Sequence, residues 1–306
     1  MSRHLIVLSC DENFFPLVKG LVLSVQERCA GAPELALVDI GLEPASRRWL
    51  EGRGVEIGTF ALDGNYDAIV ADKPYRLAQL CRPLLPDIFP GRDVYTWIDS
   101  DIWIQNGDVV EHHFQLAGRF RDKVVLSPCI DSTYPSIFKI PHDIVGALFR
   151  IYCIALGDRE QANHYAFRPI LSSGLFSMAA DNPLWGQWKA AMDQFFAKSY
   201  QRDDDLHGLE QSALNYVVYK HDAAVLLDAT YNYQCHERMP YRDEATGEVR
   251  VAMPPNRVIG AVHLTATGYY MRQYLERGLL FDRGAYLEPD ERQRLEAMGR
   301  HYQIGA

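Results

Sequence analysis

Two carboxylates, Asp99 and Asp101, flank Ser100 directly after the apolar run 94–98. A turn at this point can aim both side chains at one site, and Mg²⁺ and Mn²⁺ prefer oxygen ligands of this kind. Substrate phosphates commonly complete such sites. The spacing therefore indicates a Mg²⁺ or Mn²⁺ site that binds a diphosphate and stabilises the negative charge on a departing nucleoside diphosphate.

The residues around this pair distinguish a metal site from an ordinary acidic turn. Two acids after a strand are usually solvated turn residues, so the spacing alone is a weak signal. Here both neighbouring runs, 95–98 and 102–104, are apolar. A purely structural acidic pair between them would be buried without partners at a large cost in free energy, which a bound cation removes. The context therefore favours the metal site.

Predicted strands and helices alternate around the pair. Residues 4–9 form an apolar run typical of a strand buried on both faces, and apolar residues recur at helical spacing over 17–29. Further strands are predicted at 35–40, 55–60, 93–98, 124–129, 174–179, 224–227 and 258–263. Further helices are predicted at 44–52, 75–89 with interruptions near Pro83 and Pro86, 144–156, 184–198 and 209–219. This alternation predicts an α/β fold with a mostly parallel twisted sheet, whose strand ends bind ligands.

The domain organisation is predicted from the lack of any dividing segment in the sequence. No internal repeat, low-complexity tract or Pro/Gly-rich linker divides the 306 residues, so we expect a single domain. Its expected parts are a nucleotide- and metal-binding half at about 1–130, an acceptor-binding half at about 131–285, and a C-terminal tail at 286–306.

The composition limits the partners and the compartment. The formal net charge of −9 repels nucleic acid and anionic membranes at long range, so we expect no nucleic-acid partner. The six cysteines occur without a CxxC pair or zinc spacing, as expected of reduced, buried thiols. The sequence shows no signal peptide and no apolar run of membrane-spanning length. These features predict a cytoplasmic protein without an integral membrane segment.

Six further segments each contain at least one polar or charged residue that could line a site. They are 9–14, 81–86, 129–131, 172–174, 210–215 and 262–264. Together with the Asp-x-Asp pair, they resemble glycosyltransferase family 8, nucleotide-diphospho-sugar transferases with the GT-A fold that include glycogenin and bacterial lipopolysaccharide galactosyl- and glucosyltransferases. The resemblance covers about residues 5–270. It implies transfer of a hexose from a nucleotide-sugar donor, a UDP-hexose, to a carbohydrate or other hydroxyl acceptor, with retention of configuration.

The resemblance also implies roles for individual residues. The residues that would bind the metal ion are Asp99, Asp101 and His263. Catalytic or acceptor-side roles are implied for Gln211, Glu210 and Asp131. The donor would be bound by Asp11, Asn13, Arg82, Asp99, Ser100, Ser173, Gly174, Gly268 and Arg272.

The chain departs from the family's pattern at three places. Glu210 replaces an Asp, and Ser172 and Ser173 replace Asn-Ala, so we expect an altered sugar pocket. The phosphate-binding Lys expected soon after His263 is missing, and Arg272 is the nearest cation downstream. Because two acids and a divalent cation leave a diphosphate negatively charged, we predict that Arg272 takes the role of that Lys.

Most candidates also have a purely structural explanation. His263 could be a satisfied core or turn histidine, Gln211 a solvated amide, and Glu210 a charge favoured at a helix N-terminus. Asp131 and Asp11 could cap the loop and the helix that follow them. Geometry has to decide between these explanations and the functional ones.

Two other functions are consistent with the sequence. The missing Lys and the replaced Asp allow a degenerate sugar-nucleotide-binding protein without activity. A haloacid-dehalogenase-type phosphatase also has Asp-x-Asp after a buried strand, but near the N-terminus and with Thr or Val where this chain has Trp103.

The predicted role of Arg272 has a structural alternative too. Arg272 could simply pair with Glu276 at helical spacing on the surface.

Overall fold

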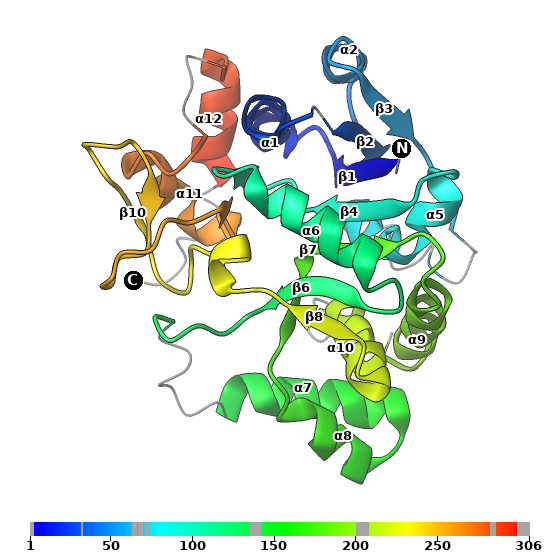
Figure 1. Ribbon diagram of the computed structural model, residues 1–306. Coiled ribbons are helices and arrows are strands. Elements are labelled where there is room, and N and C mark those ends of the chain that lie inside the picture. The colour runs from blue at the N-terminus through cyan, green and yellow to red at the C-terminus, as the bar shows by residue number, and fades with distance from the viewer. Residues whose placement is uncertain are drawn as a thin grey trace.

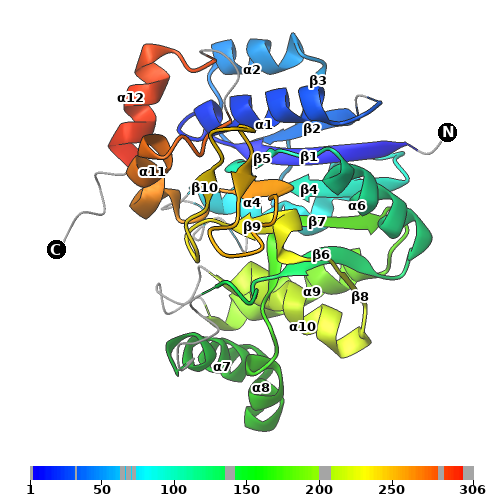
Figure 2. The same ribbon diagram turned by 60° about the vertical axis from the view of Figure 1, so that its left-hand side comes forward.

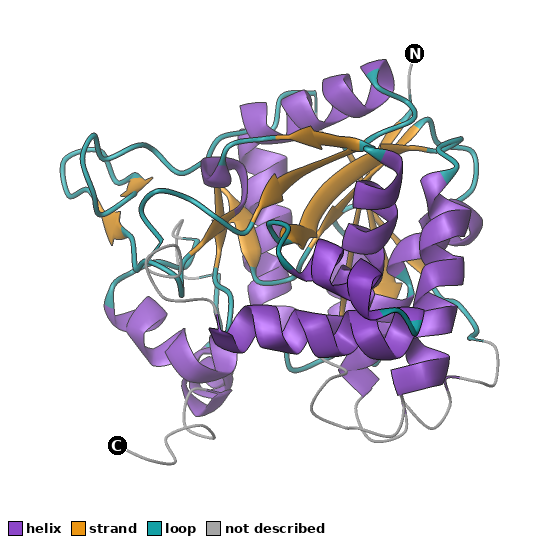
Figure 3. Cartoon of the chain, turned by 90° about the horizontal axis from the view of Figure 1, so that it is seen from below, coloured by secondary structure: helices purple, strands orange, loops and turns teal. Residues whose placement is uncertain are grey.

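A seven-stranded sheet forms the centre of the molecule. The computed structural model describes residues 3–31, 33–62, 66, 70, 74–134, 142–199, 208–281 and 286–298. The strands lie in the order β3-β2-β1-β4-β7-β6-β8. They are β1 His4–Cys10, β2 Glu34–Asp39, β3 Val55–Gly58, β4 Val94–Ile98, β6 Val124–Pro128, β7 Leu171–Ala179 and β8 Ala224–Leu226. Helices cover both faces of the sheet (Figures 1 and 3), which confirms the predicted α/β class.

The sheet is mostly parallel, with one strand reversed. β1 pairs in parallel with β2 and with β4, β2 with β3, and β6 with β8. β7 runs antiparallel to both of its neighbours, β4 and β6. The sequence does not reveal this reversal, because a strand buried on both faces shows the same apolar run in either direction. The reversal brings the beginning of β7 beside the end of β4.

Alternating side chains of β1 explain why helices cover both faces. Leu5 and Val7 belong to one apolar cluster, whereas Ile6 and Leu8 belong to another on the opposite face. The first cluster includes residues of α7 His142–Leu156, α9 Leu184–Ser199 and α10 Leu209–His221. The second includes residues of α1 Phe15–Arg28 and α6 Asp108–Arg119. Figure 2 shows α1 above the strands and α9 and α10 below them.

A three-stranded sheet meets the main sheet at the acidic turn. Its order is β5-β12-β9, formed by β5 Ile102–Ile104, β12 Ala261–His263 and β9 Tyr233–Gln234. β5 begins directly after Asp101, so the chain passes from one sheet to the other within the turn. β12 pairs antiparallel with β5 and parallel with β9. This junction brings distant parts of the sequence to Asp99 and Asp101.

The predicted helix over 75–89 is a series of short helical pieces. They are η2 Pro74–Arg76, α4 Leu77–Leu80, η3 Arg82–Leu84 and α5 Leu85–Ile88. Pro83 and Pro86 lie in the first turns of the last two, where a missing N–H is tolerated. The predicted interruptions are therefore confirmed. They place the buried Arg82 at the first residue of η3.

The C-terminal residues that the structure describes include a helix that contacts α1. α12 Pro289–Met298 follows α11 Thr267–Glu276, and its Glu291 forms a 2.7 Å ion pair with Lys19 of α1. Arg294 also reaches Glu12 at 3.3 Å. Of the expected C-terminal tail at 286–306, residues 299–306 lie outside the described residues.

Smaller elements complete the described chain. They are α2 Pro44–Glu51, α8 Arg159–Ala166, η6 Ala229–Asn232, β10 Tyr241–Arg242 and β11 Val249–Arg250. Among the described residues, no helix has the length and apolar character needed to cross a membrane.

Candidate active site

The three predicted metal ligands come together at the turn between β4 and β5. Asp99, Asp101 and His263 offer ligand atoms that all lie within 4.8 Å of one another. The strand register explains this: His263 pairs with Ile102 across β12 and β5, and the Leu264 N–H donates to the Asp101 carbonyl at 2.9 Å. Two carboxylates and an imidazole form a donor set that suits a divalent cation.

Some atoms of this cluster are used in hydrogen bonds within the protein, and the others are left to bind a metal ion. Asp99 Oδ1 accepts from Arg82 Nη2 at 2.5 Å and from Trp97 Nε1 at 2.7 Å. His263 Nδ1 lies 2.8 Å from Asn232 Oδ1, and its Nε2 lies 3.3 Å from Asp101 Oδ1. The atoms left to hold a cation are therefore Asp99 Oδ2, the Asp101 carboxylate and His263 Nε2.

Gly174 provides the space in which these atoms meet. It lies beside Asp99 because β4 and β7 pair Ile98 with Leu175, and the Asp99 N–H donates to the Gly174 carbonyl at 2.8 Å. A Cβ at position 174 would lie 2.8 Å from Asp99 Oδ2 and 2.7 Å from His263 Cε1. Any other residue would therefore push two ligands out of position, so the cluster fits a cation only because this residue is glycine.

Arg82 connects the metal cluster to the start of α10. Its Nη1 donates to Glu210 Oε2 at 2.6 Å and to Ser173 Oγ at 2.8 Å, while Nη2 binds Asp99. Its guanidinium also lies 5.1 Å from the centre of the Trp97 ring. The side chains of Arg82 and Glu210 are only 8% and 2% exposed, so these ion pairs are largely shielded from water.

The ionisation of Glu210 reflects this crowded environment. Burial raises its pKa to about 7, Arg82 opposes this rise, and the nearby charge of Asp99 adds to it. One of its oxygens, Oε1, is buried without a hydrogen-bond partner among the described residues. Glu210 thus acts in this structure as a partner of Arg82, beyond the helix N-terminal charge that the sequence suggested.

Gln211 lies next to Glu210 and shares its neighbours. Its Oε1 is 3.4 Å from Ser173 Oγ, and its Nε2 is 3.9 Å from Cys129 Sγ. Ser173 also donates to Glu210 Oε2 at 3.2 Å. The structure therefore brings Ser173, Glu210 and Gln211 together with Arg82 beside the metal cluster.

The predicted donor residues after β1 make contacts within their own loop. Asp11 Oδ1 accepts from the Phe14 N–H at 3.1 Å, and Asn13 Nδ2 donates to Asp11 Oδ2 at 3.4 Å. Ser100 Oγ donates to the carbonyl of Ser9, which ties the acidic turn to the end of β1. Asp11 thus closes the turn before α1 and does not cap the helix, whose N-cap residue is Phe14. The donor role of these residues stays a prediction.

The Asp131 carboxylate forms hydrogen bonds and an ion pair within the protein. Its Oδ1 accepts from Thr133 N and Oγ1 at 2.9 and 2.7 Å, and its Oδ2 pairs with Arg257 at 2.7 Å. Burial raises the pKa of Asp131, but the hydrogen bonds from Arg257 and Thr133 outweigh this and lower it overall. The turn explanation is thus observed, and its acceptor-side role stays a prediction.

Gly268 and Arg272 lie on α11, which follows His263 in the chain. Gly268 is in the first turn of this helix. Arg272 is 70% exposed and pairs with Glu276 at 2.7 Å, which is the surface ion pair considered above. Its predicted contact with a diphosphate stays a prediction.

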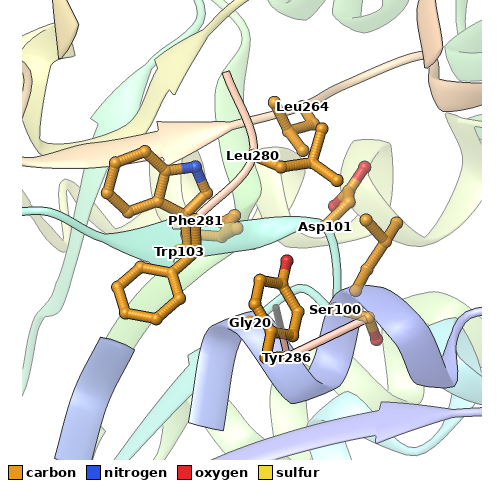
Figure 4. A pocket seen from close by; sticks show the side chains of 10 residues that line it. Gly20, Ser100, Asp101, Trp103, Leu264, Leu280, Phe281 and Tyr286 are labelled. Atoms are coloured by element: carbon orange, nitrogen blue, oxygen red, sulfur yellow. The ribbon is translucent and has the colours of Figure 1, made fainter. Parts of the chain in front are cut away.

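A narrow pocket lies beside the acidic turn, on the side of α1. Figure 4 shows Trp103 and Phe281 on one side of it and Asp101 and Ser100 on the other, with the Tyr286 ring between them. Its volume is about 10 Å³, room for roughly one water molecule, so it does not hold a nucleotide. It shows that the segment before α12 packs directly against the turn.

Two residues in direct contact with the predicted ligands were not predicted. Trp97 belongs to the buried core, and its indole N–H donates to Asp99 Oδ1 at 2.7 Å. Strand alternation places residues 97 and 99 on the same face, and this signal could have identified Trp97. Asn232, the partner of His263, has no local sequence signal, because only the packing of η6 against β12 brings it there.

No protein-family model matches the sequence, and no curated protein matches it. Among solved structures, the galactosyltransferase LgtC bound to donor and acceptor sugar analogues is similar with a TM-score of 0.53 and 14% identity, over 95% of this chain and 99% of LgtC. An active-site mutant of LgtC gives a TM-score of 0.54 and 12% identity over the same shares. The chain therefore has the GT-A fold of this glycosyltransferase.

Proposed function

We propose that this protein is a metal-dependent glycosyltransferase that moves a hexose from a UDP-sugar to the hydroxyl of a carbohydrate or other acceptor, with retention of configuration. The observation that carries the proposal is the cluster Asp99, Asp101 and His263, joined through Arg82 to Ser173 and Glu210. Two carboxylates, an imidazole and a buried guanidinium from separate parts of the chain meet here, which favours a functional site over a solvated acidic turn. The GT-A fold supports the same function.

The residues of the cluster have distinct tasks in this proposal. Asp99, Asp101 and His263 hold a divalent ion, which as a Lewis acid would stabilise the charge on the departing diphosphate. The mixture of carboxylate oxygens with an imidazole nitrogen favours Mn²⁺ over Mg²⁺, because imidazole suits transition ions better. Arg82 fixes the Asp99 carboxylate from the protein side.

The sugar would be bound beside the first turn of α10. Gln211 and Ser173 offer an amide and a hydroxyl there, and Gly174 leaves room next to the metal. The uridine would lie near the end of β1, where Asn13 contacts Asp11 and Ser100 hydrogen bonds the carbonyl of Ser9. Gly268 and Arg272 would approach the diphosphate from α11. Asp131 would lie on the acceptor side.

The test is a donor panel. Purified protein with Mn²⁺ is incubated with UDP-hexoses and other nucleoside-diphosphate hexoses, and released nucleoside diphosphate is measured with and without a chelator. We expect release from at least one UDP-hexose, loss of release with the chelator, and recovery when Mn²⁺ is restored. Full activity in metal-free protein would contradict the proposal. Tight UDP binding without release would instead support the degenerate binding protein.

Replacing Gln211 by alanine is expected to lower turnover by about 100-fold while UDP affinity changes less than threefold. The reason is that Gln211 would contact the sugar in the transition state and not the nucleotide. Rates with the best donor and calorimetry with UDP measure the two effects. Gln115→Ala, at an exposed position on α6, is the matched control. Equal losses in turnover and in UDP affinity would place Gln211 away from the reacting sugar.

A further inference from the structure

A chain of buried polar side chains approaches His263 from the side away from the other metal ligands. Asn232 Oδ1 lies 2.8 Å from His263 Nδ1, and Asn232 Nδ2 lies 2.9 Å from Ser172 Oγ. Asn232 and Ser172 are 2% and 3% exposed. Water therefore does not compete for these hydrogen bonds, and each partner is fixed by the other.

The Ser172 hydroxyl determines which way the Asn232 amide faces. Ser172 Oγ accepts from the Asn232 NH₂ group at 2.9 Å and from the Gly174 N–H at 3.3 Å. The Asn232 NH₂ group thus faces Ser172, which leaves Asn232 Oδ1 toward the imidazole. An amide oxygen can only accept, so His263 Nδ1 must carry its hydrogen. Nε2 is then the ring nitrogen that faces Asp101, at 3.3 Å from Asp101 Oδ1.

Other buried asparagines of this chain have a different kind of partner. The Asn215 side chain binds the backbone N–H and carbonyl of Leu171. The Asn182 side chain binds the Leu184 N–H and the Lys123 carbonyl. Both therefore satisfy backbone groups, as structural asparagines usually do. The Asn232 amide instead joins two side chains, one of which is a metal ligand.

We propose that Asn232 is a positioning residue that holds His263 with Nε2 directed at the metal ion, and that Ser172 fixes the Asn232 amide in the orientation this requires. The inference rests on the metal site of the proposed function and adds to it two residues outside the ligand set. Such outer partners raise metal affinity, because the imidazole does not have to lose rotational freedom or change tautomer on binding.

The test measures Mn²⁺ binding by the protein alone, without donor or acceptor. The electron paramagnetic resonance signal of free Mn²⁺ is followed during titration of the parent protein and its variants. Asn232→Ala is expected to weaken Mn²⁺ binding by about 10- to 100-fold. Asn232→Asp keeps an oxygen acceptor for Nδ1–H and is expected to stay within about threefold of the parent. Asn182→Ala, an equally buried change near α9, is the control and should leave the affinity unchanged.

Thermal melting of each variant separates a positioning role from a structural one. Ser172→Ala is the second test if Asn232→Ala does not fold, and it should weaken Mn²⁺ binding by about 3- to 10-fold. An Asn232→Ala protein that binds Mn²⁺ as tightly as the parent would overturn the proposal. If Asn232→Ala does not fold, parental Mn²⁺ affinity in Ser172→Ala would do so. An Asn232→Asp protein that binds Mn²⁺ as weakly as Asn232→Ala would also overturn it. A parent protein that binds no Mn²⁺ would also overturn it. A parent that binds Mn²⁺ but releases no nucleoside diphosphate would contradict the proposed function and leave this inference standing on the binding data.

Discussion

Asp101→Asn is expected to reduce sugar transfer by about 1,000-fold while the protein keeps its fold, because a metal ion contributes several kcal/mol of charge stabilisation in a transition state. The change removes the charge of a ligand and keeps its volume. Asp101 lies next to His263 Nε2 at 3.3 Å and its side chain is 15% exposed. Turnover with the best donor, measured at saturating Mn²⁺, gives the effect.

Stability and a matched variant complete this experiment. Without metal, Asp101→Asn should not lower the free energy of unfolding, because it removes one of two neighbouring negative charges. Asp181→Asn, on the exposed turn after β7, is the same chemical change away from the cluster and should keep full turnover. Parental turnover in Asp101→Asn would show that Asp101 is not a ligand. An unfolded Asp101→Asn protein would show that its role is structural.

The second large effect concerns stability. Arg82→Met is expected to lower the free energy of unfolding by about 3–5 kcal/mol at pH 8, because it leaves the buried Glu210 carboxylate and the partly exposed Asp99 carboxylate without their cation. The partners are Asp99 and Glu210, at 2.5 and 2.6 Å. Chemical denaturation of the metal-free protein measures the loss. Arg121→Met is the control, since the Arg121 pair with Asp181 is equally short but exposed and should contribute less than about 1 kcal/mol.

The pH dependence of this loss has a definite sign. The pKa of Glu210 is raised from 4.5 to about 7, so the folded protein binds a proton that the unfolded chain has lost between these values. Glu210 therefore lowers stability as the pH rises from about 4.5 to 7. Without Arg82, which opposes the rise in pKa, this window extends to higher pH and Arg82→Met should be closest to the parent near pH 5.

A double variant tests whether the unpaired Glu210 carboxylate causes the loss of stability in Arg82→Met. Adding Glu210→Gln to Arg82→Met removes one of the two unpaired charges and should restore part of the lost stability at pH 8. No recovery in the double variant would assign the loss to packing of the Arg82 stem. A loss below 1 kcal/mol in Arg82→Met would contradict the buried network itself.

The Glu210 carboxylate is shared by two neighbours. Its Oε2 accepts from Arg82 Nη1 at 2.6 Å and from Ser173 Oγ at 3.2 Å. The altered sugar pocket that the sequence suggests at Glu210 and Ser173 stays a prediction.

Local patterns determined much of the architecture from the sequence alone. Apolar runs and turn residues located the β1 to β4 strands and the intervening helices, because burial on both faces leaves its mark within a few neighbouring residues. The carboxylates Asp99 and Asp101 were placed at a strand end for the same reason. α6 was not predicted, although it lies in the second apolar cluster and packs on the sheet. The resemblance, and not periodicity, pointed to His263 and Gln211.

Only the tertiary structure decided how these residues meet. The direction of β7 places Gly174 beside Asp99, and the pairing of β12 with β5 places His263 beside Asp101. Arg82 of η3 contacts Glu210 of α10 although 128 residues separate them in the sequence. Such contacts leave no local pattern, since they depend on strand order and register between distant segments. The sequence therefore determined which residues could do chemistry, and the register of two sheets decided which of them do it together.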